Sequence, residues 1–209
     1  MLNNIMTEGE CSKLRSLIHH ANNIVLCCHV SPDGDAIGSV LGMAEVLKCM
    51  GKEPVMVVPD QFPDYLQWLP NTEKIVRYDK RSDYVDMVLK IADLVICLDF
   101  NALSRTDDME AALEACTAPR VLIDHHLNPS IACQVCVSHP NMSSASELVF
   151  RVAWQLGLFE QLGRHFATAV YCGMMTDTGG FTFNSNSPET FYIISQLLTK
   201  HINKDKIYR

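Results

Sequence analysis

The sequence lacks any apolar run of membrane-spanning length, and it lacks an excess of basic residues. Its 209 residues include 17 Lys and Arg against 24 Asp and Glu, which gives a formal net charge of -7. Because non-specific binding to nucleic acid needs a basic surface, this balance argues against a long duplex as partner. The first ten residues also lack the basic and then apolar order of a secretion signal. We therefore expect a cytoplasmic protein with no membrane partner.

A disulfide framework is also absent, although the chain has nine cysteines. Most of them lie inside apolar runs, where cysteine behaves as a small hydrophobic residue, so we expect them to be reduced and mostly buried. The pair Cys133 and Cys136 has CxxC spacing, but no second pair completes a zinc site, and alternate residues of a strand explain the spacing. With 48% hydrophobic and 20% charged residues and no internal repeat, one globular domain is the simplest prediction.

Apolar runs alternate with stretches of helical spacing along most of the chain. Strands are expected over 23–28, 53–58, 74–78, 93–98, 120–123 and 131–137. Helices are expected over 11–21, 36–50, 82–92, 107–116, 148–156, 165–175 and 188–200. This alternation predicts an α/β fold with a mainly parallel β-sheet of about five strands, helices on both faces and a helix-rich C-terminal third.

Three of the apolar strands end in side chains that can bind metal. His29, Asp33 and Asp35 follow the first strand, Asp99 follows the fourth apolar run, and residues 124–126 (Asp-His-His) follow the fifth. A single aspartate after a strand is usually a turn residue or a helix cap. In a parallel sheet, however, all three strand ends share one edge, which is where open α/β sheets hold ligands.

A fourth acidic residue, Asp177, lies between two expected helices in the turn-rich stretch 176–181 (Thr-Asp-Thr-Gly-Gly-Phe). With Asp33, Asp35 and Asp99 it completes four carboxylates, enough to neutralise two divalent cations, while His29 and His125 add neutral nitrogen ligands. This oxygen and nitrogen set without thiolate suits manganese better than a structural zinc site. Two metal ions about 4 Å apart activate a bridging water and clamp the oxygens of a displacement at phosphorus. The sequence thus predicts hydrolysis of a phosphate ester or anhydride.

These stretches resemble the four ordered motifs of the DHH phosphoesterase superfamily. The motifs are His-Val-Ser-Pro-Asp-Gly-Asp-Ala from residue 29, Asp99, residues 124–126 and residues 176–181, and the match spans about residues 20 to 185. The first motif is similar to the bacterial branch that contains oligoribonucleases (nanoRNases) and 3'-phosphoadenosine 5'-phosphate phosphatases. Family II pyrophosphatases usually have Asn-Pro-Asp-Thr-Asp at that point.

The resemblance implies a role for each ligand. The first manganese ion would be held by His29, Asp33 and Asp99, and the second by the set Asp35, Asp99, His125 and Asp177, with Asp99 bridging. Mg²⁺ or Co²⁺ would be substitutes. His126 would face the scissile phosphate as a catalytic residue, and Asp124 would orient a histidine or fix the turn.

Three further residues are candidate substrate contacts. Ser143 and Ser144 resemble a serine-rich segment near the site in this branch, and a role as helix caps explains them equally well, with Glu147 completing a capping box. Arg105 follows Asp99 and is a candidate for a phosphate contact, although a surface ion pair is the simpler interpretation.

One departure from the branch concerns its smaller C-terminal domain, whose Gly-Gly-Gly-His motif grips the nucleotide. No such motif occurs here. We expect residues 1–209 to be the catalytic domain alone, with 141–209 leading into an absent substrate-binding domain. Expected substrates are short single-stranded oligonucleotides or small nucleotide phosphates, and a homodimer is one possible assembly. The alternatives are a family II-like pyrophosphatase, a cyclic-dinucleotide phosphodiesterase and a non-catalytic nucleotide- or metal-binding domain.

Overall fold

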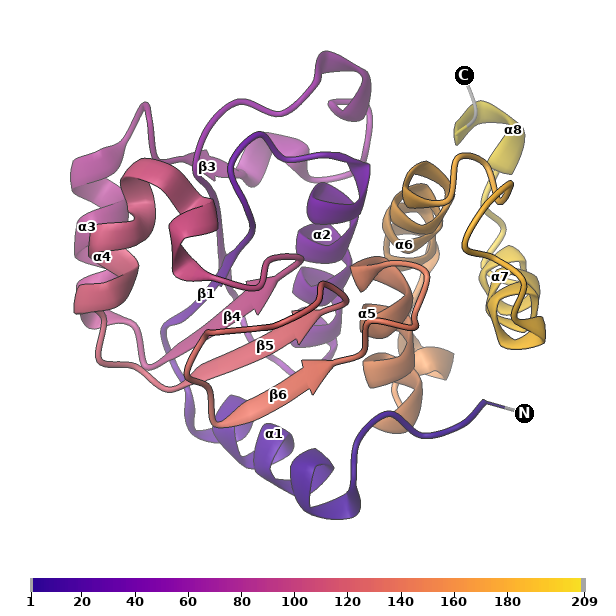
Figure 1. The fold of residues 1–209 in the computed structure, drawn as a ribbon, viewed down its shortest axis with the longest axis horizontal. Helices are drawn as coiled ribbons and strands as arrows, with labels where there is room; N and C mark the ends of the chain where they lie inside the picture. Colours follow the sequence, from indigo (N-terminus) through magenta and orange to yellow (C-terminus); the bar gives the residue numbers. More distant parts are fainter. Residues whose placement is uncertain (1, 208–209) are drawn as a thin grey trace.

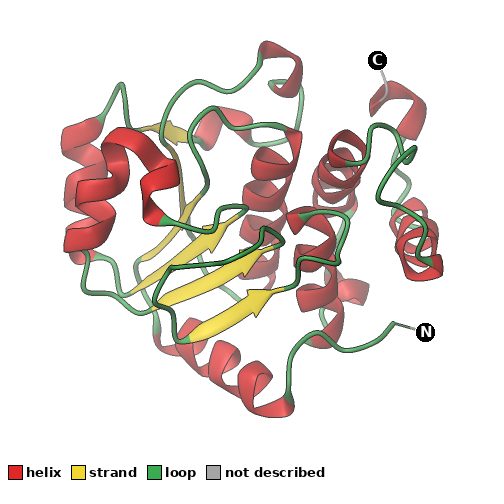
Figure 2. Cartoon of the chain, in the orientation of Figure 1, coloured by secondary structure: helices red, strands yellow, loops and turns green. Residues whose placement is uncertain are grey.

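The computed structural model describes residues 2–207 and has a single parallel sheet at its centre. The strands are β1 (Ile24–Cys27), β2 (Val55–Val58), β3 (Val76–Arg77), β4 (Leu94–Leu98), β5 (Arg120–Asp124) and β6 (Val135–Ser138). Their order across the sheet is β3-β2-β1-β4-β5-β6, and every neighbouring pair is parallel. The arrows in Figure 2 accordingly point the same way.

Helices cover both faces of this sheet. They are α1 (Glu8–His20), α2 (Gly34–Cys49), α3 (Ser82–Ile91), α4 (Glu110–Ala115), α5 (Ala145–Gln155), α6 (Arg164–Asp177), α7 (Pro188–Leu198) and α8 (Lys204–Ile207). Short 3-10 turns occupy Asp64–Leu66, Thr72–Lys74, Leu103–Met109 and Phe159–Gln161. Figure 1 shows α3 and α4 on one face of the sheet and α2, α5 and α6 on the other. No helix in the described range is both long and apolar enough to cross a membrane.

Two hydrophobic cores result from this layering. Alternate residues of β1 enter opposite cores: Leu26 packs with the α1, α2, α5 and α6 side, whereas Val25 and Cys27 pack with the α3 and α4 side. Side chains of a strand alternate between faces, so a strand covered on both sides must be apolar throughout. All four residues of β1 and all five of β4 are buried. Five of the nine cysteines are also buried, as expected.

The predicted α/β class is confirmed, and several details of the prediction are corrected. The sheet has six strands instead of about five, because the two-residue β3 and the half-exposed β6 both pair at its edges. Helix α4 begins only at Glu110, since Asp107 has a φ of 51° that interrupts the preceding turn. Helix α5 begins at Ala145, directly after the expected cap Ser144, whereas α6 extends to Asp177 and α8 is not predicted from the sequence. Tyr208 and Arg209, at the expected connector, lie outside the described residues.

The sheet order sets the position of the site. The strands β2 and β3 lie on one side of β1, and the chain then returns to place β4, β5 and β6 on the other side. In open α/β sheets the crevice at the carboxyl ends of the strands beside such a switch holds ligands. The adjacent strands β1, β4 and β5 are the three that end in the predicted ligands, so the expectation of one shared edge is confirmed.

Candidate metal centre

The loop after β1 divides its polar residues between two positions. His29 follows the strand, and its Nδ1 donates to the carbonyl of Val30 at 2.7 Å, which leaves Nε2 to face the site. Asp33 is the N-cap of α2, where its Oδ1 accepts from the amide of Ala36 at 2.9 Å. Asp35 is the second residue of the same helix and is 1% exposed. The two aspartates therefore project from different points on the start of α2.

Asp99 follows β4 in a left-handed backbone conformation, with a φ of 66°. Such a conformation is uncommon outside glycine and clusters at functional sites, although aspartate tolerates it better than most residues. The amide of Asp99 still donates to the carbonyl of Ile123 in β5, at 3.0 Å, so the turn begins at the last rung of the sheet. Asp99 is 2% exposed.

Asp177 does not follow a strand, and contacts between helices bring it to the site. It is the last residue of α6, which packs closely against α2. A Cβ added at Gly34 would collide with the side chain of Thr176, and one added at Gly38 would collide with the carbonyl of Ala169. Only glycine permits this approach of the two helices. The spacing of glycines at 34, 38 and 42 is the signal in the sequence that predicts a close helix contact.

The ligand atoms of these stretches converge on two groups that share one carboxylate. Asp99 Oδ2 lies 3.3 Å from His29 Nε2, which also lies 3.6 Å from Asp33 Oδ1. Asp99 Oδ1 lies 3.6 Å from His125 Nε2, which also lies 3.6 Å from Asp35 and 3.4 Å from Asp177. Ligand atoms lie within 4.8 Å of one another in three sets of residues: His29, Asp33 and Asp99; Asp35, His125 and Asp177; and Asp99, His125 and His126. These separations exceed the usual hydrogen-bond range of about 2.7–3.2 Å and suit ligands around a shared cation.

The pKa values of two histidines and two carboxylates in the cluster are shifted in the direction that favours bound positive charge. Burial alone lowers the pKa of His29 and of His125, but the carboxylates around them outweigh it and raise these pKa values to about 10 and about 9. Burial, with the charge of Asp99, raises the pKa of Asp35 well above its ordinary value, and the pKa of Asp177 rises to about 6, mainly through burial. No Lys or Arg among residues 2–207 forms an ion pair with these carboxylates. The donor set thus fits divalent cations, which would replace the protons that the histidines otherwise carry.

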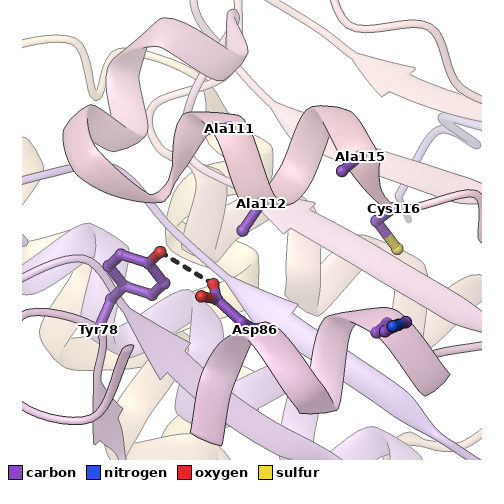
Figure 3. A pocket seen from close by; sticks show the side chains of 7 residues that line it. Tyr78, Asp86, Ala111, Ala112, Ala115 and Cys116 are labelled. Carbon is purple, nitrogen blue, oxygen red and sulfur yellow. Dashed lines mark hydrogen bonds between the residues drawn. The ribbon is translucent and has the colours of Figure 1, made fainter. Parts of the chain in front are cut away.

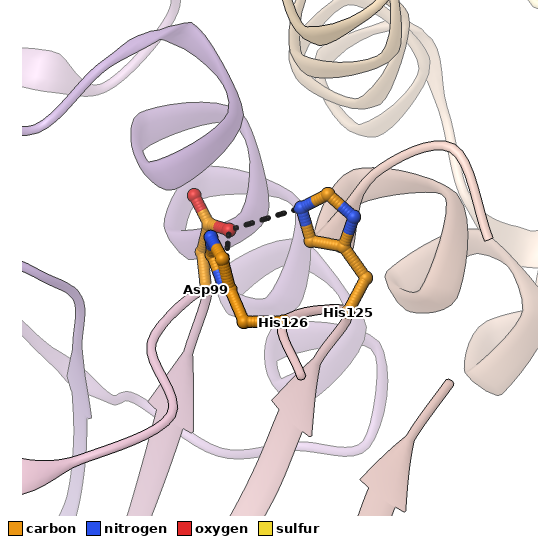
Figure 4. A group of neighbouring side chains, drawn as sticks. All are labelled: Asp99, His125 and His126. Atoms are coloured by element: carbon orange, nitrogen blue, oxygen red, sulfur yellow. Dashed lines mark ion pairs between the residues drawn. The ribbon is translucent and has the colours of Figure 1, made fainter. Parts of the chain in front are cut away.

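The second histidine of residues 124–126 points differently from the first. In Figure 4, His125 and His126 both approach the carboxylate of Asp99. His126 Nδ1, however, lies only 2.6 Å from Asp124 Oδ1 and 3.9 Å from Asp99 Oδ1. Asp124 is fully buried, whereas the side chain of His126 is 36% exposed. The hydrogen bond to Asp124 raises the pKa of His126. It also fixes Nδ1, so Nε2 is the ring nitrogen left for a ligand.

Backbone groups that the motifs did not predict hold two of these side chains. The amides of Ala145 and Ser146, at the start of α5, donate to the two carboxylate oxygens of Asp35 at 2.9 and 2.8 Å. The carbonyl of Met142 accepts from His125 Nδ1 at 3.3 Å. Any residue type can supply a backbone amide or carbonyl, so the sequence does not reveal these contacts directly. The predicted helix start near Ser144 is the one signal for them.

Of the three candidate substrate contacts, Ser143 and Ser144 are buried and Arg105 is exposed. Ser144 is buried and caps α5 by accepting from the amide of Glu147 at 3.0 Å, and Ser143 is buried and donates to the Glu147 side chain at 2.7 Å. The predicted capping box is wrong in its second half, because the Glu147 carboxylate bonds Ser143 and Arg151 instead. The side chain of Arg105 is exposed, and its carbonyl accepts from the amide of Val30 at 2.7 Å. Substrate contact by these three residues stays a prediction.

An apolar pocket of about 430 Å³ lies away from this centre, between α3 and α4. Figure 3 shows its wall, where the hydroxyl of Tyr78 donates to Asp86 at 2.9 Å beside Ala112 and Cys116. None of the converging histidines and carboxylates lines it. We therefore place the candidate chemistry at the strand ends and not in this pocket.

Comparison with known proteins adds an independent result. The model of the DHH family, N-terminal domain, matches residues 23–174. The chain belongs to the DHH family. This confirms the resemblance to the DHH superfamily; the matched range contains the first three motifs and ends before residues 176–181.

Relatives within the DHH family cover most of this chain. A bifunctional oligoribonuclease and PAP phosphatase NrnA from Thermus thermophilus is 33% identical over 178 residues, which is 84% of this chain and 49% of that protein. A cyclic-di-AMP phosphodiesterase PdeA from Listeria monocytogenes is 27% identical over 192 residues, 88% of this chain and 29% of that protein. The chain thus spans about half the length of the Thermus relative.

A solved structure agrees with the fold. The crystal structure of an exopolyphosphatase-related protein from Bacteroides fragilis superposes with a TM-score of 0.97 at 44% identity. It covers 100% of this chain and 61% of the other. The arrangement of strands and helices described above is therefore shared with the matched part of that protein.

Proposed function

We propose that this chain is the catalytic part of a two-metal phosphoesterase that hydrolyses short oligonucleotides or nucleotide phosphates. The observation that carries the proposal is the convergence of two ligand groups that share Asp99. One group is His29, Asp33 and Asp99, and the other contains His125 with Asp35 and Asp177. A carboxylate with one oxygen toward each group is the arrangement expected of a bridging ligand.

Manganese is the cation that this donor set supports best. Both groups combine carboxylate oxygens with imidazole nitrogen and contain no thiolate, which favours manganese over a structural zinc site. Magnesium usually keeps more water and fewer protein ligands, so Mg²⁺ and Co²⁺ are proposed as substitutes. When bound, two such ions activate water and withdraw charge from phosphate oxygens.

The residues of the chain supply orientation and a proton donor. Asp124 holds His126 Nδ1 at 2.6 Å, and the same nitrogen lies 3.9 Å from Asp99, so Nε2 is the ring nitrogen left to face a phosphate. As the imidazolium, whose pKa the Asp124 hydrogen bond raises, His126 donates its Nε2 proton to a phosphate oxygen, either a non-bridging oxygen that gains charge or the leaving oxygen as its bond to phosphorus breaks, and is left as the neutral ring. His29 and His125 each turn Nδ1 to a backbone carbonyl, which keeps Nε2 directed at the ligand groups.

The substrate class rests on relatives and on charge. The Thermus relative is named an oligoribonuclease and PAP phosphatase, and the Listeria relative a cyclic-di-AMP phosphodiesterase. The net charge of -7 disfavours long nucleic acid and leaves recognition to a site whose carboxylates the metal ions neutralise. Small nucleotide phosphates are therefore favoured, and the cyclic dinucleotide is the second candidate.

The test is a substrate panel with the 209-residue chain loaded with manganese. Di- to pentanucleotides and 3'-phosphoadenosine 5'-phosphate should be cleaved, and the cyclic dinucleotide and pyrophosphate should be cleaved more slowly. Preferential hydrolysis of pyrophosphate or of the cyclic dinucleotide would move the assignment to that alternative. Tight binding of two manganese ions with no turnover on any substrate would instead support the non-catalytic binding domain.

A further inference from the structure

The segment 142–146 holds both side chains that are central to the second ligand group. Its amides at Ala145 and Ser146 bind the carboxylate of Asp35, and its carbonyl at Met142 accepts from His125 Nδ1. Asp35 and His125 thus depend on the position of the same five residues. His29 and Asp33 are held instead by their own loop and by the start of α2.

A buried network of Glu147, Arg151 and their partners holds this segment through Ser143. Glu147 Oε1 accepts from Ser143 at 2.7 Å and from Thr190 at 3.2 Å, and Glu147 Oε2 accepts from Arg151 Nε at 2.9 Å. Arg151 also donates to Glu189 Oε2 at 2.9 Å. Glu147 and Arg151 are 1% and 2% exposed. Buried charges of this kind are costly to desolvate, so an apolar pair of equal volume would serve packing at least as well.

The network also joins three separate parts of the chain. Arg151 lies on α5, Glu189 lies in the first turn of α7, and the amide of Asn3 donates to Glu189 Oε1 at 2.8 Å. With Thr190 bonded to Glu147, the start of α5 is held from two sides. A shift of α5 along its axis would break these bonds and would move the amides that bind Asp35 by the same amount.

We propose that Glu147 and Arg151 are positioning residues that hold Asp35 and His125 in place for the second metal ion. This inference rests on the two-metal site of the proposed function. Groups that orient metal ligands typically change metal affinity about 10- to 100-fold when they are removed. Because the network contacts segment 142–146, which holds Asp35 and His125, its loss should weaken the binding of one metal ion and leave the binding of the ion at His29 and Asp33 unaffected.

The test is a manganese titration of the double variant Glu147→Gln with Arg151→Met, which removes both buried charges together, while the Glu189 carboxylate keeps its hydrogen bond from the amide of Asn3. We expect one ion to bind as in the wild type and the other about 10- to 100-fold more weakly. Arg151→Lys should lie between, because a lysine provides a single charged donor where Arg151 contacts two carboxylates. Ser143→Ala, which deletes one bond to Glu147, provides a milder variant that retains the ion pair should the double variant not fold; it should weaken the same ion a few-fold.

Leu113→Ala is the matched control for a loss of stability alone. Leu113 is fully buried in the core on the α3 and α4 side, away from segment 142–146. This variant should unfold at lower temperature and still bind two ions with wild-type affinity. Equal weakening of one ion in Leu113→Ala, or wild-type affinity for both ions in the double variant and in Ser143→Ala, would overturn the inference. A wild type that binds fewer than two ions would overturn the proposed function itself and the inference with it.

Discussion

The metal centre combines ligands that follow strands with ligands that lie on helices, and the fold positions the two kinds differently. His29, Asp99 and His125 follow the adjacent strands β1, β4 and β5, whose backbone hydrogen bonds fix their separation. Asp35 and Asp177 lie at the start of α2 and the end of α6. The distance between these two aspartates depends on glycines of α2, which leave no Cβ between α2 and α6. The comparison teaches that the strand ligands tolerate repacking, whereas a single added methyl group can displace the helix ligands.

The largest expected effect comes from the strand ligand that both groups share. Asp99→Asn keeps the shape of the side chain and tolerates the left-handed backbone, but it removes the charge that each group uses. We expect the loss of tight binding for both manganese ions and a fall in kcat well beyond about 100-fold. Metal titration and initial rates measure this, with the circular dichroism spectrum as a check of folding. Retention of both ions would refute the bridging role.

The next effect concerns a strand-end residue that is not proposed to bind metal. His126→Ala should lower kcat about 10²- to 10⁴-fold, because a positioned proton donor is lost. Binding of both manganese ions should stay within a few-fold of the wild type, since Asp124 and not a ligand group holds the ring. Asp124→Asn should reproduce part of this loss by releasing the ring. If His126→Ala lost a metal ion instead, His126 would belong among the ligands.

A substitution between the helices tests the other side of the comparison. Gly38→Ala places a Cβ against the backbone carbonyl of Ala169, which has no flexible side chain to move aside. We expect a loss of roughly 1–3 kcal/mol in the free energy of unfolding and weaker binding of the ion near Asp177. Gly9→Ala in α1, where the added Cβ meets ordinary van der Waals contact, is the control. Denaturant unfolding and metal titration of both variants distinguish a local from a general effect.

The smallest effect should come from the exposed side chain beside the strand ligands. Arg105→Ala leaves the carbonyl that accepts from Val30 in place, so metal binding and stability should not change. If the guanidinium contacts a substrate phosphate, KM should rise about five-fold, which corresponds to about 1 kcal/mol for an exposed charge pair. The comparison of KM values for a nucleotide phosphate and for inorganic pyrophosphate shows whether the contact depends on the nucleotide. An unchanged KM for both would assign Arg105 to the solvated surface.

Prediction from sequence succeeded where short-range pattern controls structure. The buried strands β1, β4 and β5 are continuous apolar runs, so the prediction needed only composition and length. It was less accurate for β3 and β6, because short edge strands depend on a neighbour for their pairing and have little pattern of their own. The start of α5 follows from its local cap, since Ser144 accepts from the amide of Glu147, whereas α6 extends two residues beyond its predicted end.

The sequence by itself determined the chemistry of this protein: the number of carboxylates and imidazoles, their place after apolar strands, and the family to which the motifs belong. Only the tertiary structure decided how these groups are held. Asp177 reaches the site through the contact of α2 with α6, and Asp35 is bound by amides more than 100 residues away. Residue type encodes what a side chain can bind. Packing between distant segments fixes where that side chain lies, because backbone amides and missing Cβ atoms act only once the segments meet.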